Sequence, residues 1–430
     1  MKAFGRGIVV AILTWEAKLL LKRTRPQIVA ITGSVGKTST KDAIYTVLKD
    51  SVRARKSAKS YNSEIGMPLT ILGLETAGRN PLKWLKNIID GFFVMLHPGD
   101  YPKVLVLEMG VDRPGDMKKL TDWIRPDVVV LTRLPDIPTH VEFFDSPEAV
   151  VDEKWELVKA LKPDGDLVFN QDDEKIRSKV PEIRQTAIGY SRYSLSPYTA
   201  SGDTIIYDRG VPAGIEFRMT HADEVATIRI MESLGIQQAY NAAAACAVAS
   251  IFDIDLPTAA NRLCAHVPPP GRMRVLKGLK DTLIIDDTYN SSPVASERSL
   301  QTLKELGGVK RKIVVFADMM ELGQYSMQEH ERIGGLIAGA ADVLYTIGVR
   351  SRKTAEGALE HGMDELNIYQ YDDMMRAANE LEARLEPGDV VLVKGSQSMR
   401  AERVVEEIMG EPERFEELLV RQEPMWQNRR

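Results

Sequence analysis

The sequence predicts an α/β protein with a central phosphate-loop ATPase domain on a mainly parallel sheet and a C-terminal doubly wound, Rossmann-like domain. Two observations predict this fold class. An apolar strand, a glycine turn and a helical pattern follow one another at residues 26–48. Beyond residue 271, apolar strands alternate with helical patterns, which is typical of a doubly wound parallel sheet. We expect an N-terminal helix at 1–25 and domains at 26–270 and 271–430.

Length and composition are those of an ordinary globular protein. The chain has 430 residues, of which 44% are hydrophobic and 27% are charged, and its formal net charge is −5. This charge gives no sign of a nucleic-acid footprint, so we expect no nucleic-acid partner. The two cysteines, Cys246 and Cys264, match no CxxC or zinc-binding spacing and predict reduced thiols in the cytoplasm. We expect a monomer.

The N-terminal segment contains a short apolar run, IVVAILTW, from Ile8 to Trp15. A helix that spans a bilayer needs about 20 mostly apolar residues, and the charges of Glu16 and Lys18 interrupt this run too early. The segment has no small-residue cleavage site of the kind that would indicate a signal peptide. We expect a helix packed on the first domain. A helix with basic flanks at a membrane surface is the alternative.

The stretch TGSVGKTST, from Thr32 to Thr40, resembles a phosphate-binding loop but has Ile31 where the common G-x-x-x-x-G-K-[ST] pattern has its first glycine. An apolar strand at 26–31 precedes it and a helical pattern at 41–48 follows, as such a loop requires. Its backbone N–H groups can bind phosphate at a helix N-terminus. We predict that the nucleotide contacts Gly33, Ser34, Val35, Gly36, Lys37, Thr38 and Ser39, with the Thr38 hydroxyl on Mg²⁺.

Two candidate functional side chains follow apolar strands farther along the chain. Glu108 comes directly after the strand at 104–107, and His140 comes after the strand at 128–132. Metal ligands on a parallel sheet are expected on loops at the carboxyl ends of its strands. A glutamate that only caps its strand and a histidine in a surface loop are the alternatives.

The remaining strands define the two predicted domains. Segments 204–207, 214–219 and 227–230 predict short strands in an antiparallel patch on the central domain. Pro268–Gly271 is a predicted hinge. Beyond it, the strands of the doubly wound sheet are expected at 282–285, 312–316, 343–347 and 390–393, and no G-x-G-x-x-G sequence there indicates a dinucleotide. The charged segment 411–430 is expected to form a peripheral helix or a frayed tail.

TGSVGKTST is similar to the ATP loop of the Mur ligases, which keeps T-G-x-x-G-K-T-[ST] without the first glycine. Taken alone, the loop would also admit the related folylpolyglutamate and cyanophycin synthetases. Further segments narrow the choice, because they resemble Mur ligases in the family's order over residues 26–410. These are NSEIGMP (62–68), LEMG (107–110), DDTYN (286–290) followed by Pro293, DMMELG (318–323) with His330, and VKGS (393–396).

The resemblance implies an ATP-dependent ligase that converts a carboxylate to an acyl phosphate, from which an amine displaces the phosphate. Positioning and charge neutralisation by Lys37 and Mg²⁺ would supply most of the catalysis. The family implies Thr38 and Glu108 as ligands of one Mg²⁺, and His140 with a carbamylated Lys154 as ligands of a second. A plain exposed lysine on the predicted helix at 150–158 is the alternative for Lys154. The loop before His140 is longer and richer in proline than the family suggests.

The resemblance also assigns the other candidate residues. Asn241 would hydrogen-bond the adenine, although Gln237 and Gln238 replace the family's histidine and asparagine in that segment. Arg272 would contact the nucleotide from the hinge, and Asp287 would contact the ribose. The expected substrate residues are Asn62, Ser63, Asn290 and Pro293.

Within the family, the chain is most similar to the ligases that add D-alanyl-D-alanine to a UDP-linked muramyl tripeptide, a peptidoglycan precursor. We therefore expect these peptide substrates, with ATP and Mg²⁺ as cofactors. The alternatives are a similar ligase for an amino-acid polymer or a cofactor precursor, or a nucleotide-dependent binding module without ligase activity. Only 31 residues precede Thr32, so we expect the family's N-terminal UDP-binding domain to be missing.

Overall fold

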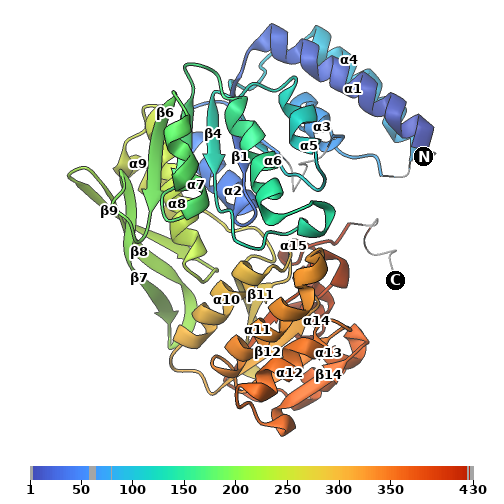
Figure 1. Ribbon diagram of the computed structural model, residues 1–430, viewed down its shortest axis with the longest axis vertical. Helices are drawn as coiled ribbons and strands as arrows, with labels where there is room; N and C mark the ends of the chain where they lie inside the picture. Colours follow the sequence, from blue (N-terminus) through green and yellow to red (C-terminus); the bar gives the residue numbers. More distant parts are fainter. Residues whose placement is uncertain (1–2, 58–63, 79, 424–425, 427–430) are drawn as a thin grey trace.

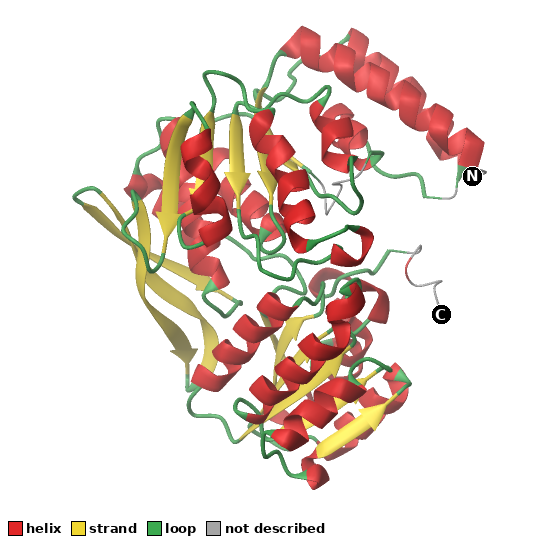
Figure 2. Cartoon of the chain, viewed as in Figure 1, coloured by secondary structure: helices red, strands yellow, loops and turns green. Residues whose placement is uncertain are grey.

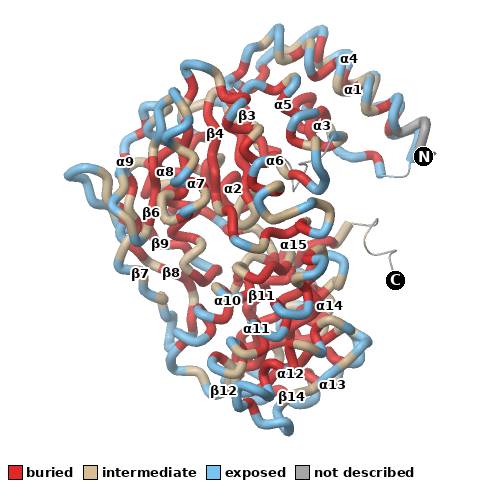
Figure 3. The backbone as a smooth tube through the Cα atoms, in the orientation of Figure 1, coloured by how far each residue is buried: buried red, intermediate tan, exposed pale blue. Residues whose placement is uncertain are grey.

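The protein contains two β-sheets, each flanked by helices (Figures 1 and 2). The computed structural model describes residues 3–57, 64–78, 80–423 and 426. One sheet has nine strands and the other has six. Buried residues concentrate in these sheets and in the helix faces that cover them (Figure 3). The mixed α/β class with large, mainly parallel sheets is thereby confirmed.

The nine-stranded sheet has the order β2-β3-β1-β4-β5-β6-β7-β8-β9. Its strands pair in parallel from β2 to β7, and β7, β8 and β9 pair antiparallel. The strands are β1 (Gln27–Thr32), β2 (Ala54–Lys56), β3 (Val104–Glu108), β4 (Val128–Leu131), β5 (Asp166–Asn170), β6 (Thr186–Ser191), β7 (Tyr198–Asp208), β8 (Val211–His221) and β9 (Glu224–Met231).

Strand register places the loops that follow β1, β3 and β4 side by side at the carboxyl ends of these strands. Ile31 of β1 lies opposite Glu108 of β3, and Thr32 lies opposite Leu131 of β4. The carboxyl ends of these neighbouring strands are therefore level. In parallel α/β sheets such an edge, where strand order reverses, is where ligands bind.

The antiparallel patch is confirmed, but its strands are longer than the sequence predicts. β7 and β8 each have 11 residues and β9 has eight, because their pairing continues past the apolar residues to the turns, as at Asp208 and Val211. Apolar runs mark only the buried centre of such strands, since backbone hydrogen bonds also hold their polar ends.

The six-stranded sheet has the order β10-β11-β15-β12-β13-β14 and is parallel except for β10. Its strands are β10 (Arg274–Lys277), β11 (Leu283–Asp287), β12 (Arg311–Ala317), β13 (Val343–Ile347), β14 (Ile368–Tyr371) and β15 (Asp389–Lys394). The four predicted strands correspond to β11, β12, β13 and β15. The predicted boundary at residues 270 and 271 falls between the two sheets and stays a prediction.

The helices cover both sheets. Around the first sheet they are α1 (Ala3–Thr24), α2 (Lys37–Leu48), α3 (Gly66–Leu72), α4 (Pro81–Leu96), α5 (Asp116–Thr121), α6 (Pro147–Lys159), α7 (Glu174–Lys179), α8 (Gln237–Ile251) and α9 (Leu256–Cys264). Around the second they are α10 (Pro293–Glu305), α11 (Ser326–Ala338), α12 (Arg352–Glu360), α13 (Met374–Arg384), α14 (Glu402–Ile408) and α15 (Phe415–Leu418).

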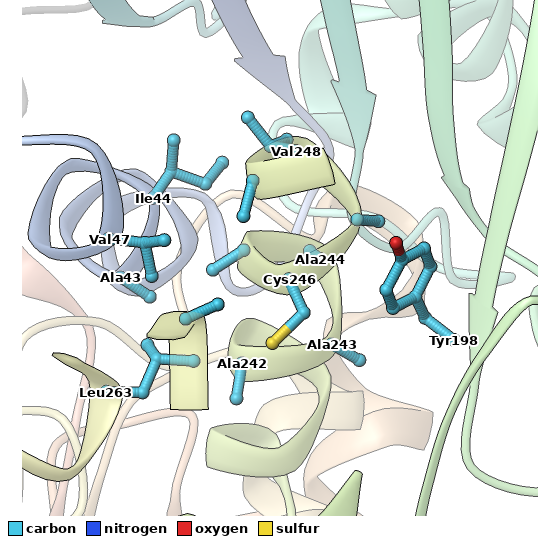
Figure 4. Close-up of a cluster of buried hydrophobic side chains, with 14 of the residues drawn as sticks. Ala43, Ile44, Val47, Tyr198, Ala242, Ala243, Ala244, Cys246, Val248 and Leu263 are labelled. Carbon is cyan, nitrogen blue, oxygen red and sulfur yellow. The ribbon is translucent and has the colours of Figure 1, made fainter. Parts of the chain in front are cut away.

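The alanine-rich helix α8 is almost wholly buried. Its small side chains let α2 and the sheet approach closely, and Figure 4 shows Ala242 and Ala244 of α8 with Ile44 and Val47 of α2. Cys246 lies in the same cluster, where burial raises the pKa of its thiol to about 12. This cysteine therefore acts as a small apolar side chain in the core.

Helix α1 packs on the first sheet's unit, as predicted. Leu13, Ala17 and Leu20 are fully buried against neighbouring core residues, and α3 and α4 are the helices it contacts. Arg23, near its end, donates to the carbonyl oxygens of Met95 and Leu96 at 3.3 and 2.7 Å, which caps the end of α4. No helix in the described part of the chain is long and apolar enough to cross a bilayer.

The C-terminal segment forms a short helix, α15, which agrees with one of its two expected forms, but the residues that follow this helix pack into the fold. Arg421 is buried, and its guanidinium donates to the carbonyl oxygens of Thr288 and Tyr289 at 2.5 and 2.9 Å. The same group pairs with the buried carboxylate of Glu402 at 2.6 Å. This arginine ties the chain end to the loop that follows β11, a long-range pairing that no local charge pattern reveals.

Candidate active site

A cavity of about 760 Å³ lies between the two sheets and is called here the central cavity. From the first sheet's unit it is lined by the loop and first turn at residues 34–38, Glu108, Asp112, Thr139 and His140. From the second it is lined by Arg272, residues 289–292, Ala295, Met320, Glu321, Met374, residues 396–400, Arg403 and Trp426. A smaller cavity has a volume of about 60 Å³. Like the central cavity, it is lined by Val35, Gly36, Arg272 and Asn290, and Ser39 also lines it.

The structure explains why the loop lacks its first glycine. Ile31 is still within β1, fully buried and paired with β3, so the chain has not yet turned there. The turn is made by Gly33, whose φ is 144°. A Cβ atom on Gly33 would lie 2.0 Å from the Thr132 hydroxyl, so no larger residue fits. Gly36, with φ 89°, then begins α2 as its N-cap.

Lys37 and Thr38 lie in the first turn of α2, which begins four residues earlier than the sequence predicted. The first N–H groups of a helix have no intrahelical partner and can bind an anion. Burial lowers the pKa of Lys37, and the charge of Arg272 lowers it further, while Glu108 opposes the shift. A phosphate bound here would stabilise this partly buried cation. Arg272 also donates to the Thr38 hydroxyl at 3.2 Å.

Glu108 ends β3 at the same edge. Its side chain is buried, and Oε2 has no hydrogen-bond partner among the residues that the structure describes. Its backbone N–H donates to the Ser57 hydroxyl at 3.2 Å, which fixes the strand end. A buried carboxylate oxygen without a partner is costly, and a bound cation would satisfy it. This chemistry fits a Mg²⁺ ion beside Thr38.

His140 joins the two halves of the site. Its backbone is left-handed, with φ 70°, and its Nδ1 lies 2.7 Å from Oε2 of Glu321, which belongs to the second sheet's unit. Its Nε2 lies 3.6 Å from Asp112. The close contact with His140 lowers the pKa of Glu321. The proline-rich loop before His140 therefore still delivers this side chain to the central cavity.

Lys154 is buried in α6, so the alternative of an exposed surface lysine is wrong. Burial lowers the pKa of its ammonium to about 7, and the charge of Lys37 contributes to the shift. Asp112 and Glu153 act in the opposite direction. A buried amine with a pKa this low is substantially uncharged near neutrality, which is the form that reacts with CO₂.

The donor set suits magnesium with its nucleotide better than a metal held by protein alone. No three described His, Cys, Asp or Glu side chains gather as a metal-binding group. Mg²⁺ usually takes one or two carboxylates and completes its shell with water and substrate phosphates. Glu108, Thr38 and a phosphate in the loop would meet that need.

Asn241 lines the smaller cavity, but its amide already has protein partners. Its Oδ1 accepts from the Thr40 hydroxyl at 3.1 Å, and its Nδ2 donates to Gln238 at 3.3 Å. The neighbouring Gln237 has a buried Nε2 with no partner in the described structure. In the sequence Gln237 is only a departure from the family pattern, whereas its geometry makes it a candidate donor to the nucleotide base.

Arg272 and Asp287 line the smaller cavity from the second sheet's unit. The Arg272 guanidinium stacks on the Tyr289 ring, 3.8 Å from its centroid. Asp287, at the end of β11, accepts from the Ser299 hydroxyl at 2.6 Å and from Lys394. Asp287 therefore lines the smaller cavity, although its carboxylate is also part of an internal network.

The substrate residues separate in space. Asn290 lines both cavities, and its Oδ1 accepts from the Gln397 N–H at 3.4 Å. Pro293 instead begins α10 and lines neither of these cavities but another one, beside residues 133–137. Proline there fits the helix start, which needs no N–H. Asn62 and Ser63 lie outside the described residues.

Several residues that line the central cavity had no role in the sequence analysis. They are Asp112, Glu321, Arg400, Arg403 and Trp426. Glu321 lies within the DMMELG segment, so the motif itself was the signal, but the partner of its carboxylate could not be read from it. The arginines come from the chain after β15, where an isolated basic residue has no distinctive pattern.

Comparison with protein families gives two matches that follow one another along the chain. Residues 31–249 match the Mur ligase middle domain, and residues 271–397 match the Mur ligase glutamate ligase domain. The first match alone covers half of the chain.

Individual relatives agree with these matches. The UDP-N-acetylmuramoyl-tripeptide–D-alanyl-D-alanine ligase of Bacillus subtilis is 28% identical over 401 residues, covering 92% of this chain and 79% of the relative. The enzyme of the same name from Mycobacterium tuberculosis strain H37Rv is 30% identical, covering 86% and 70%. The crystal structure of MurF ligase from Thermotoga maritima with ADP has a TM-score of 0.75 at 26% identity, covering 93% of this chain and 83% of that one.

Proposed function

Because this chain belongs to the Mur ligase family, we propose that it joins D-alanyl-D-alanine to the muramyl tripeptide of a UDP-linked peptidoglycan precursor. The chain is an ATP-dependent acid–amino-acid ligase, and the relatives named for this substrate pair cover most of its length. The observation that carries the proposal is the gathering of Lys37, Thr38, Glu108 and His140 around the central cavity.

The reaction balances as two displacements. A carboxylate oxygen of the tripeptide attacks the γ-phosphorus of ATP, and ADP leaves. The amine nitrogen of D-alanyl-D-alanine then attacks the acyl carbon of the acyl phosphate, inorganic phosphate leaves, and the nitrogen loses a proton. Most of the catalytic effect in such transfers comes from positioning and charge neutralisation.

We propose the following roles for this chain's residues. The N–H groups of the loop and the Lys37 ammonium hold the phosphates, and Arg272 contacts the nucleotide beside Thr38. Thr38 and Glu108 would hold one Mg²⁺, and His140 with a carbamylated Lys154 would hold a second. Bound Mg²⁺ supplies charge neutralisation at the phosphoryl oxygens. Asn290 lies where both cavities meet and would orient the reacting groups.

The direct test supplies the purified chain with ATP, Mg²⁺, UDP-N-acetylmuramoyl-tripeptide and D-alanyl-D-alanine. We expect phosphate release that requires all components, and a product whose mass equals the two substrates joined with loss of water. A panel of other carboxylates and amines is run in parallel. If a different pair is turned over and this one is not, the proposed substrates are wrong although the ligase chemistry stands.

We also propose that α1 contacts a membrane peripherally. The support is the exposure of Ile8 and Trp15 on this helix, which are 48% and 52% exposed. Tryptophan beside basic residues is typical of helices that lie at the membrane–water interface.

Glu321 should orient His140 for metal binding. A carboxylate that accepts from one imidazole nitrogen fixes the ring and raises the basicity of the other nitrogen. Replacing Glu321 with glutamine removes the charge but keeps the size, so we expect kcat to fall about tenfold to a hundredfold and the Mg²⁺ concentration for half-maximal rate to rise. Initial rates over a Mg²⁺ titration measure both.

The matched control for this variant is Glu142→Gln. Glu142 lies two residues from His140, and its backbone N–H reaches the Glu321 carbonyl at 3.5 Å, but its carboxylate is not the partner of His140. We expect little change in this control. Unaltered Mg²⁺ dependence in Glu321→Gln would show that the 2.7 Å contact has no role in metal binding.

A further inference from the structure

Helix α4 carries an unusual line of exposed apolar side chains, called here the α4 stripe. Its members are all large and between 37% and 76% exposed: Leu82, Leu85, Ile89, Phe92, Phe93 and Leu96. Scattered exposed apolar residues are normal on a protein surface, but a contiguous group on one element marks an interaction site. The stripe lies far in sequence and in space from the second sheet (Figure 1).

The spacing places the whole stripe on one side of the helix. At 100° per residue, these six positions fall within an arc of roughly 100°. The side that packs on the protein is different and is formed by Trp84, Gly91 and Met95, which are buried. α4 is therefore apolar on two faces, of which only one is needed to hold the helix in place.

α4 and α1 form one closely packed platform. A Cβ atom on Gly91 of α4 would lie 2.3 Å from the Glu16 carboxylate of α1, so the two helices meet where glycine leaves room. Burial raises the pKa of Glu16 to about 7, which reduces its negative charge near neutrality. Figure 3 shows the pair at one end of the molecule, with much of its outer surface exposed.

Basic side chains lie beside the stripe, although one of them, Lys86, pairs with Asp90 of the same helix at 2.8 Å. Lys83 and Lys86 are exposed on α4, and Lys22 and Arg23 are exposed in the last turn of α1. The guanidinium of Arg23 binds the Leu96 carbonyl, which fixes a positive charge at the end of the stripe. Together the two helices contain six Lys and Arg but only two Asp and Glu, in a chain whose net charge is −5.

We propose that the α4 stripe and its basic flanks dock on the surface of an anionic lipid bilayer, with α4 lying in the plane of the interface. Leucine, isoleucine and phenylalanine on one face beside lysine and arginine are the chemistry of interfacial helices. Anionic lipids also attract basic residues next to the inserted face. The proposal differs from a contact through α1 alone because α4 supplies most of the apolar surface.

Charge distinguishes this partner from a second copy of the chain. A symmetric dimer brings the same surface of each copy together. Contact through the stripe would then bring together two surfaces that are both rich in Lys and Arg, and like charges across an interface are unfavourable. A bilayer with anionic headgroups has the complementary charge. Docking by this end also leaves the central cavity, which lies between the two sheets, open to solvent.

The test is co-sedimentation of the full chain with lipid vesicles. Vesicles of phosphatidylcholine alone are compared with vesicles containing about 30% phosphatidylglycerol, at low and high salt, because attraction to anionic lipids is screened by salt. We expect binding to the anionic vesicles that weakens with salt. Absence of sedimentation with anionic vesicles at low salt overturns the proposal.

Two variants locate the surface. Phe92→Gln with Phe93→Gln removes apolar contacts, and Lys83→Glu with Lys86→Glu reverses the flanking charge; each should weaken binding to anionic vesicles at least tenfold. Leu195→Gln is the matched control, because Leu195 is 99% exposed but lies outside α4. Circular dichroism and ATP turnover with soluble substrates verify that each variant is folded. Wild-type binding in both double variants overturns the proposal.

Size-exclusion chromatography tests whether a second copy of the chain covers the stripe instead. A dimer that dissociates in the Phe92 and Phe93 variant would show that a second copy covers the stripe and would overturn the membrane assignment. Vesicle binding is measured without nucleotide or substrate, so its failure and a failure of the proposed ligase reaction are independent results.

Discussion

Lys37→Ala is expected to lower ADP formation by about a thousandfold or more, which corresponds to about 4 kcal/mol of transition-state stabilisation at 1.36 kcal/mol per decade. Lys37 is the first residue of α2, directly after the glycine turn, and its partly buried side chain lines the central cavity. Loss of solvent contact makes the uncompensated Lys37 cation unfavourable. A bound phosphate would supply the missing negative charge. Alanine removes the charge and leaves the helix intact.

The rate of ADP formation at saturating ATP is the measurement. Lys49→Ala is the matched control, because Lys49 is an exposed lysine just after the end of the same helix. We expect near-normal turnover in that control. An Lys37→Ala enzyme that keeps most of its ADP formation would contradict the phosphate-loop assignment, whatever its affinity for substrates.

Local sequence predicted those site residues that lie at or just after the carboxyl end of a single strand. The parallel sheet places the ends of neighbouring strands at a common edge. For that reason Glu108 at the end of β3 and His140 after β4 could be placed near the loop before any contact was known. The same reasoning predicted four strands of the second sheet, because buried parallel strands are apolar along their whole length.

Contacts between distant segments could not be predicted in the same way. The Glu321 carboxylate meets His140 from the other sheet's unit, and Arg421 reaches the loop after β11 from the chain end. Asn241 was expected to contact adenine, which stays a prediction, and its amide also pairs with Thr40 and Gln238. In each case the residue type is visible in the sequence, but its partner depends on how separate elements pack.

The second apolar face of α4 could not be predicted from the sequence, for a related reason. An apolar helix pattern predicts burial, and the sequence does not say how much of the apolar surface the neighbouring elements cover. Trp84 and Met95 are covered, whereas Phe93 is 59% exposed. Only the packed structure separates the face that stabilises the fold from the face that remains available to a partner.

Lys154→Ala is the second variant with a large expected effect, a loss of about a hundredfold or more in kcat, or about 2.7 kcal/mol at 1.36 kcal/mol per decade. The neutral amine of Lys154 would attack CO₂ to form an N–C bond and a carboxylate, with release of one proton. Burial favours this neutral form because it lowers the pKa of Lys154 to about 7. The resulting anion would complete the oxygen ligands around a second Mg²⁺, where an ammonium would be repelled.

Chemical rescue distinguishes this role from a merely structural one. Acetate or formate can fill the space that alanine leaves and supply the missing carboxylate, so we expect these anions to restore part of the Lys154→Ala activity. Lys159→Ala, on the same helix but with its side chain 61% exposed, should retain normal turnover. Equilibration with ¹³C-bicarbonate gives a readout without turnover: a carbamate carbon signal in the wild-type chain that is lost in Lys154→Ala. Normal turnover of Lys154→Ala, or a wild-type chain without that signal in the presence of Mg²⁺ and ATP, would show that Lys154 is buried without being carbamylated.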